Sequence, residues 1–487
     1  MSVNARTALL HLLERRKDDL AHTDDVEQTQ AGRMMLLAIM LGVALTIFYQ
    51  LGVPLRATHG ARVSADEPFY LLTTVSLLND GDLDLTNDYA LERYHAFYDH
   101  PDALWHQSKP TADGRLPSPH NLGLSLLIVP AYAVGGLDAV KAFLAMIGAA
   151  TVAATAMLAY RFTGQTWPSL ISAALLGVSA PFFVYASQVY PEMPAALCLA
   201  LALLVLTQPS LGWRSALLLV VLLSSMAWLG SKYALVASIA GYFALLRFDN
   251  PGRAAFLGAG IISGIAYAGF HLATYGGLTP YGVNVVYFGQ DTAGLLGAHF
   301  EFINRLYRLA GLWIDGEFGL IRWAPFLLLA LPALPWLFRQ TNGDKLALAA
   351  VLAGQIMVAA FLSITMRGWW FPGRMLIVVL PVLAVLVAVT LARLSTARWG
   401  YAITALLGLY GLGITLALIA ETAAERVVLI VDPFAMDWPP FRLIAGFFPV
   451  YTSYEPPTWV LTAAWAIAAT VLVALSRSLF SPTKPQE

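Results

Sequence analysis

The sequence has little charge and almost no cysteine. Only 12% of its 487 residues are Asp, Glu, Lys or Arg, about half the share expected of a soluble protein. Cys198 is the only cysteine, which excludes an intramolecular disulfide and a cysteine-based metal cage. The net charge of −1 gives no electrostatic sign of nucleic acid or of a strongly acidic partner.

Motifs for common soluble cofactors are also missing. The sequence contains no phosphate-binding Gly-Lys-Ser/Thr loop, dinucleotide fingerprint, His-Glu-x-x-His motif or nucleophile elbow. These absences argue against an ATP-driven pump and against an enzyme with a soluble cofactor. No internal repeat is apparent, so an inverted-repeat transporter gains no support.

The sequence is instead rich in apolar runs of membrane-spanning length, and its mean hydropathy is +0.66. Basic residues of the short loops fall at every second loop, which the positive-inside rule assigns to the cytoplasm together with both termini. We therefore expect an all-α polytopic bundle of about twelve spans. The expected spans are 33–55, 138–160, 167–187, 190–207, 214–230, 232–247, 254–275, 320–338, 345–365, 373–392, 399–420 and 458–476.

The apolar segment 121–136 is too short for an ordinary span, with Pro130 inside it and Gly135-Gly136 at its end. Because a span there would break the charge alternation, we interpret it as a juxtamembrane or re-entrant helix packed against protein. If it crosses the membrane, the total becomes thirteen.

The rest of the chain divides into tails and loops around a transmembrane domain at 32–476. Residues 1–31 are expected to be a cytoplasmic tail, either an amphipathic helix on the membrane surface or poorly ordered, and residues 477–487 a second cytoplasmic tail. Three long outer loops, at about 56–137, 276–319 and 421–457, are expected to carry the site, because functional residues concentrate on loops held by a rigid scaffold.

The acidic pair Asp66-Glu67 begins a predicted helix in the first of these loops, where Pro68 and Tyr70 follow. Two adjacent carboxylates cost free energy to keep ionised, which favours a base at the boundary between lipid and water. A simple helix N-cap is the structural alternative. His120, which opens segment 121–136, is either a substrate contact or a structural hydrogen-bonding residue.

Four further charged residues lie near the outer face in apolar surroundings. Glu192, in a very short outer loop, is costly there unless it is paired or functional. Lys232 interrupts a hydrophobic hairpin, and Arg367 and Arg374 bracket Gly368-Trp-Trp-Phe-Pro-Gly373. Arginine suits a phosphate, so we expect a phosphate contact above all at Arg374. The alternatives are snorkelling to lipid headgroups or pairing with Asp315 or Glu317.

A metal site has weak support in the sequence. Asp82 and Asp84, in Asp80-Gly-Asp-Leu-Asp84, could hold a hard cation, although a solvated turn after a helix is the more frequent structure for such a segment. No histidine of the first loop has a zinc-like partner on a clear helix. The sequence therefore predicts no specific cofactor, and a divalent cation stays an open alternative.

The pattern resembles the GT-C class of membrane glycosyltransferases, which includes protein O-mannosyltransferases and bacterial aminoarabinose transferases. The resemblance rests on Asp66-Glu67 after the first span and on four short motifs in later outer segments. These motifs are Ser118-Pro-His-Asn-Leu-Gly123, Tyr190-Pro-Glu192, Asp315-Gly-Glu-Phe-Gly-Leu320 and Pro372-Gly-Arg-Met375.

The resemblance implies a fold with juxtamembrane helices in the first outer loop. It also implies a sugar donor on a polyprenyl phosphate, Asp66 as general base with Glu67 beside it, and Arg374 or Lys232 near the lipid phosphate. The residues independently fit an inverting displacement onto a hydroxyl acceptor, because a base and phosphate-stabilising cations are present without a second carboxylate nucleophile.

Several properties remain expectations. The transferred sugar is a hexose or pentose, and the acceptor is lipid-linked or a cell-envelope glycan rather than a protein, because the chain has no soluble domain after the last span. The enzyme is expected in the bacterial inner membrane with an extracytoplasmic active site. The rival hypotheses are a transporter or flippase of lipid-linked intermediates and a structural or assembly subunit.

Overall fold

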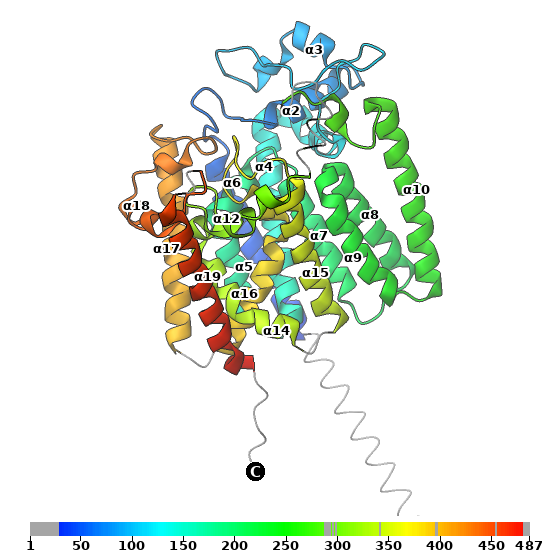
Figure 1. Ribbon diagram of the computed structural model, residues 1–487. Coiled ribbons are helices and arrows are strands. Elements are labelled where there is room, and N and C mark those ends of the chain that lie inside the picture. Colours follow the sequence, from blue (N-terminus) through cyan, green and yellow to red (C-terminus); the bar gives the residue numbers. More distant parts are fainter. Residues whose placement is uncertain are drawn as a thin grey trace, which may run out of the picture.

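The computed structural model describes residues 29–480, with gaps at 287–293, 295–296, 298–299, 340–341, 395–397 and 453–454. Within these residues, β-structure is limited to an isolated antiparallel bridge between Ser108 and Asn284, and the remaining elements are helices (Figure 1). The all-α prediction is confirmed. Most of the predicted tail at 1–31, and residues 481–487, lie outside the described part of the chain.

Among the described residues, seven helical segments are long and apolar enough to cross a membrane. The segments are Thr29–Gly52, Leu122–Thr163, Asn250–Val283, Gly343–Leu362, Arg374–Leu394, Arg398–Ala423 and Pro456–Phe480. Two of them are single helices, α4 (Leu122–Thr163) and α17 (Arg398–Ala423). Most of the others contain α10 (Asn250–Tyr275), α15 (Gly343–Met357) with η7 (Val358–Leu362), η8 (Arg374–Val379) with α16 (Leu380–Leu394), and α19 (Pro456–Ser476).

The other predicted spans coincide with bent or shorter helices. The pair α5 (Thr166–Val178) and α6 (Ala180–Ser187) is bent by 64° and makes an eighth candidate. The shorter helices are α7 (Glu192–Leu206), α8 (Trp213–Leu229), α9 (Ala234–Arg247), and η6 (Pro325–Ala333) continued by α14 (Leu334–Phe338). Within the described residues, length and composition alone thus support seven or eight spans, and the twelve or thirteen expected from charge alternation would also require the shorter apolar helices to cross.

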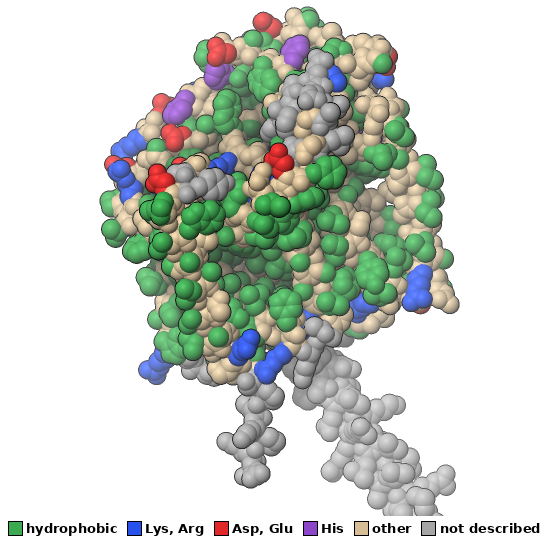
Figure 2. Space-filling view, in the orientation of Figure 1, with side chains coloured by type: hydrophobic (Ala, Val, Ile, Leu, Met, Phe, Trp, Pro, Cys, Tyr) green, Lys and Arg blue, Asp and Glu red, His purple; other side chains and the backbone are tan. Residues whose placement is uncertain are grey.

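The two ends of the bundle differ in charge and in structure. In the face drawn in Figure 2, acidic and histidine side chains gather at the upper end together with several Lys and Arg, whereas the lower edge shows mainly Lys and Arg. The upper end carries α2 (Glu67–Asn79) and α3 (Thr86–Ala90) with their loops (Figure 1). The predicted helices of the first long loop are therefore present, and we call this the loop-side end.

Helix α4 has the break that its glycines predict. Gly135 and Gly136 have non-helical backbone angles, and they separate a short first limb from the long second one. The first limb packs against α2, because the Ser125 hydroxyl donates to the Tyr70 carbonyl over 2.9 Å and Thr74 donates to the Ser125 carbonyl over 3.1 Å. This packing fixes the start of α4, and with it His120, beside the start of α2.

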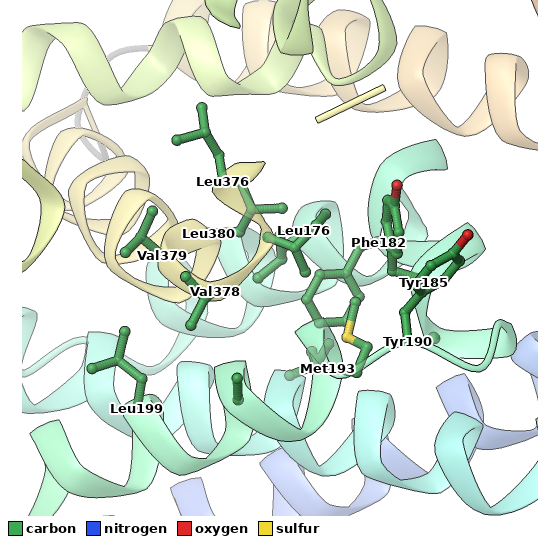
Figure 3. Packing of buried hydrophobic residues seen from close by; sticks show 14 of the residues in the cluster. Leu176, Phe182, Tyr185, Tyr190, Met193, Leu199, Leu376, Val378, Val379 and Leu380 are labelled. Carbon is green, nitrogen blue, oxygen red and sulfur yellow. The ribbon is translucent and has the colours of Figure 1, made fainter. Parts of the chain in front are cut away.

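The core beneath the loop-side end joins α6 and α7 to η8 and α16. Phe182 and Met193 pack together there, with Leu376 and Leu380 nearby (Figure 3). Above them the Tyr185 hydroxyl donates to the Phe371 carbonyl over 2.6 Å, which satisfies a buried polar group. The core thereby holds the segment before η8 against the start of α7.

Candidate active site

Four charged side chains from four separate segments meet at the loop-side end. Arg374 donates from Nη2 to Asp66 Oδ2 over 2.7 Å and from Nε to Glu192 Oε1 over 2.8 Å. Lys232 Nζ donates to the same Glu192 oxygen over 2.7 Å. Glu192 and Arg374 are buried, whereas the side chains of Asp66 and Lys232 are 23% and 25% exposed. Two carboxylates therefore face two cations, and the side chains of Asp66 and Lys232 remain accessible.

Asp66 occupies the N-cap position of α2 without capping it, because its side chain accepts no hydrogen bond from the first turn. The N-cap alternative is therefore wrong for this side chain. Ala65, just before it, has a φ of 46°, a strained conformation of the kind found at functional sites. Burial would raise the pKa of Asp66, but the charges of Arg374, His120 and Lys232 outweigh it and lower the pKa below its usual value. Asp66 is consequently ionised at neutral pH.

Glu67 is fully buried and bonded to backbone groups. Its carboxylate accepts from the Ser64 amide and from the Val189 amide, each over 2.7 Å. Burial raises the pKa of Glu67 despite the opposing charge of Lys141 and these hydrogen bonds. The side chain ties the turn before α2 to the loop before α7, which places Asp66 opposite Glu192.

Arg374 is positioned by the glycine before it and by two aromatic rings. Gly373 has a φ of 84°, and a Cβ there would lie 2.4 Å from Cδ1 of Leu320. The Arg374 guanidinium carbon lies 4.4 Å from the Tyr190 ring centroid and 5.2 Å from that of Trp370, within the range of cation–π attraction. The guanidinium is thus held before any ligand arrives.

Lys232 and His120 approach the network from two other loops. Lys232 lies on η3 (Ser231–Tyr233), between α8 and α9. Burial lowers its pKa from the ordinary 10.5, although Glu192 opposes this shift. His120 Nε2 lies 2.8 Å from Gln107 Oε1 and 4.0 Å from Asp66 Oδ1. Because burial also lowers the pKa of His120, the imidazole is neutral at pH 7.

Two cavities of different character adjoin at this network. One, the polar cavity, has a volume of about 100 Å³; the other, the apolar cavity, has a volume of about 290 Å³. Both are lined by Asp66, Ser231, Lys232, Tyr281 and Arg374. The polar cavity adds Tyr70, Gln107, His120, Asn121 and Asn284. The apolar cavity adds Leu235, Val358, Leu362, Ile364, Trp370 and Met375, among others.

Other residues expected at the site lie elsewhere. Arg367 Nη2 donates over 2.5 Å to Asp315 Oδ2, whose side chain is fully buried, so the pairing alternative is confirmed for this arginine. Asp82 accepts from Ser76, and Asp84 stabilises its own loop through backbone amides. The described residues contain no group of three or more His, Cys, Asp or Glu able to hold a metal ion.

Sequence reasoning missed several residues that line the polar cavity. Gln107 carries no signal in its local sequence. Tyr281 and Asn284 lie in Thr279-Pro-Tyr-Gly-Val-Asn284, whose proline, glycine and aromatic residues in a long outer loop could have drawn attention. The backbone of this segment pairs with the first loop, since the Lys109 amide donates to the Val283 carbonyl over 2.9 Å and the Val285 amide to the Gln107 carbonyl over 2.9 Å.

Comparison with known proteins gives a likeness of fold. No family model matches the chain, and a search of curated proteins gives no match. Similar solved structures include ArnT from Cupriavidus metallidurans, bound to undecaprenyl phosphate (TM-score 0.44) and in the apo state (0.45). Both are 15% identical over 91% of this chain and 77% of theirs. The apo Archaeoglobus fulgidus oligosaccharyltransferase is 12% identical over 94% of this chain and 62% of its own, with a TM-score of 0.43. These neighbours are GT-C glycosyltransferases, the class that the sequence resembles.

Proposed function

We propose that this chain is a membrane glycosyltransferase that moves a sugar from a polyprenyl-phosphate donor to a hydroxyl acceptor, with Asp66 as general base. The observation that carries the proposal is the position of one accessible carboxylate and two cations where a polar and an apolar cavity adjoin. A lipid-linked sugar needs these features together, since its tail is apolar, its phosphate anionic and its sugar polar.

The two cations suit the phosphate of the donor. Lys232 has three N–H donors, one of which binds Glu192, and its side chain lines both cavities. Arg374 lines both cavities as well. Positioned cations stabilise the charge that develops on a leaving phosphate. The aliphatic side chains of the apolar cavity, such as Leu235 and Leu362, suit the first isoprene units of the tail.

The acceptor would enter the polar cavity and give its proton to Asp66. Its oxygen bonds to the anomeric carbon, the bond from that carbon to the phosphate oxygen breaks, and the electron pair leaves with the phosphate. Protonation of Asp66 weakens its ion pair with Arg374 as the phosphate gains charge, so the guanidinium becomes available to the leaving group. One base without a second carboxylate nucleophile gives inversion at the anomeric carbon. Glu67 and Glu192 position these groups.

The remaining features follow from the same placement. We propose that the loop-side end faces away from the cytoplasm, in a bacterial inner membrane, with both termini cytoplasmic if the chain crosses the membrane twelve times. We propose a lipid-linked or envelope glycan as acceptor, whose hydroxyl would enter the polar cavity of about 100 Å³. Hexose or pentose donors both remain candidates, and a divalent cation is not required by the proposal.

The test is transfer of labelled sugar from a panel of polyprenyl-phosphate donors by the purified protein and by Asp66→Asn. We expect transfer by the wild type and a loss of about 10²-fold or more in the variant. Asp102→Asn is the matched control, because the Asp102 side chain is 87% exposed on the same loop, and it should keep wild-type activity. Equal transfer by wild type and Asp66→Asn would refute the catalytic assignment, and failure with every donor would favour a transporter of lipid-linked intermediates.

A further inference from the structure

A third cavity lies among the membrane helices, separate from the proposed site. Its volume is about 550 Å³, and its walls come from α12 (Arg308–Ile314), α13 (Leu320–Trp323), η6, α14, α15, α16 and α19. Figure 2 shows a hollow between α19 and α15 on the face drawn, in the region of these walls. We call this space the α19 cavity.

The α19 cavity offers almost nothing to water. Nearly all of its lining is hydrocarbon or aromatic, and the polar atoms it contains already have partners. The Thr462 hydroxyl donates to the Thr458 carbonyl over 2.7 Å, and the Trp465 indole nitrogen donates to the Phe447 carbonyl over 2.8 Å. A buried water needs two to four polar partners, whereas apolar cavities of about 150 Å³ stay dry and take up hydrocarbon ligands.

The dimensions of the α19 cavity match one lipid chain. Along α19 its lining runs from Thr462 to Leu472, a rise of about 15 Å. This is half the thickness of a bilayer core of about 30 Å, and therefore the depth of a single leaflet. Because α19 is an almost wholly exposed span, bilayer hydrocarbon lies directly beside the cavity.

The apolar cavity that we propose for the donor lipid is lined by a different part of the helical segment Gly343–Leu362. Leu352 and Ile356 of α15 line the α19 cavity, whereas Val358 and Leu362 of η7 line the apolar cavity beside Arg374. The α19 cavity shares no lining residue with either cavity of the proposed site among the described residues. The α19 cavity is thus separate from the cavity that we propose for the donor lipid.

We propose that the α19 cavity binds the hydrocarbon chain of a membrane phospholipid. The chain fills a void that would otherwise deprive its walls of dispersion contacts, and it supports α15. The choice of a phospholipid over the donor lipid rests on the proposed function, whereas occupancy itself is measured without substrate.

The test uses the full-length protein in nanodiscs of phosphatidylcholine that carries a diazirine in the middle of one acyl chain. After photolysis, mass spectrometry locates the labelled residues. We expect label on Leu383 of α16, which lines the cavity and is only 4% exposed. Ala469→Phe, which places a ring in the cavity, should reduce this labelling.

Ala464→Phe is the matched control, because Ala464 is exposed on α19 and outside the cavity lining. It should leave the α16 labelling unchanged. If Ala469→Phe does not fold, Ala466→Phe fills the same space. Absence of label on α16 in the wild type, or equal labelling in wild type and cavity-filled protein, would overturn the proposal. Displacement of the label by added undecaprenyl phosphate would also overturn it, because the occupant would then be a polyprenyl chain.

Discussion

Glu192 Oε1 accepts hydrogen bonds from both Arg374 and Lys232, so this single oxygen holds the two cations of the proposed site together. The Glu192 side chain is only 1% exposed. Removing one member of a buried ion pair leaves uncompensated charge, which costs far more than losing an exposed pair. We therefore expect stability and the proposed transfer reaction to depend on the same residue.

Glu192→Gln should lower the free energy of unfolding by about 3–5 kcal/mol, measured as thermal unfolding in one detergent. The matched control is Asp437→Asn, whose ion pair with Arg442 is exposed on both sides. That change should cost less than about 1 kcal/mol. Equal stability of Glu192→Gln and wild type would show that the carboxylate is not needed to hold the cations.

Lys232 should determine the pH at which the rate of sugar transfer falls on the alkaline side of its pH profile. Burial lowers its pKa from 10.5, so the ammonium loses its proton, and the phosphate its cation, at a lower pH than an ordinary lysine would. In Lys232→Arg the charge persists at all accessible pH values, so the alkaline limb should move to higher pH. A pH profile of transfer measures this shift. Lys109→Arg, a substitution on the first loop outside the network, should leave the profile as in the wild type; an unshifted limb in Lys232→Arg would contradict the assignment.

At the scale of elements, the segment before η8 carries the strictest local requirement. Gly373 has a positive φ, and any Cβ there would also meet Leu320. This backbone conformation directs Arg374 toward both Asp66 and Glu192. Glycine is therefore required at position 373 for the backbone conformation of this segment.

Gly373→Ala should cost roughly 1–2 kcal/mol of backbone strain and reduce transfer at least tenfold, because Arg374 is displaced. Gly264→Ala serves as control, since Gly264 lies in α10 with open space around it and alanine favours a helix. Transfer rates and unfolding temperatures of both variants give the comparison. Wild-type transfer by Gly373→Ala would mean that the turn does not position Arg374.

The sequence predicts the helices better than it predicts their meeting points. Run length locates the apolar helices, although several of them are shorter than the predicted spans or bent. Gly135-Gly136 predicts the break in α4 because non-helical angles suit glycine. The convergence of Asp66, Glu192, Lys232 and Arg374 joins segments up to 308 residues apart, which local patterns cannot indicate. The same limit explains why the sequence does not predict Gln107 at the site. Arg367 has the same charge and a similar sequence context as Arg374, and it differs in its tertiary partner, Asp315.

At the scale of the whole molecule, the asymmetry of charge between the two ends predicts an orientation in the membrane. Asp102 lies on the loop-side end, and Ser210 lies between α7 and α8 at the other end; both residues are exposed. The positive-inside rule assigns the Ser210 loop to the cytoplasm.

In a Cys198→Ser background, a membrane-impermeant maleimide should label Asp102→Cys in intact cells and Ser210→Cys only after lysis. Labelling is read by mass shift on a gel, and the cysteine-free parent controls for background. The opposite pattern would place the proposed site in the cytoplasm and exclude an extracytoplasmic acceptor.

The central claim is that Asp66 takes the proton of the acceptor while the cations hold the lipid phosphate. The most direct test is single-turnover transfer by protein loaded with donor, with donor affinity measured on the same samples. Asp66→Asn should bind donor at least as tightly as the wild type, because a negative charge is removed near the phosphate, and its transfer step should be slower by about 10²–10⁴-fold. A transfer step of wild-type rate in Asp66→Asn would contradict the account.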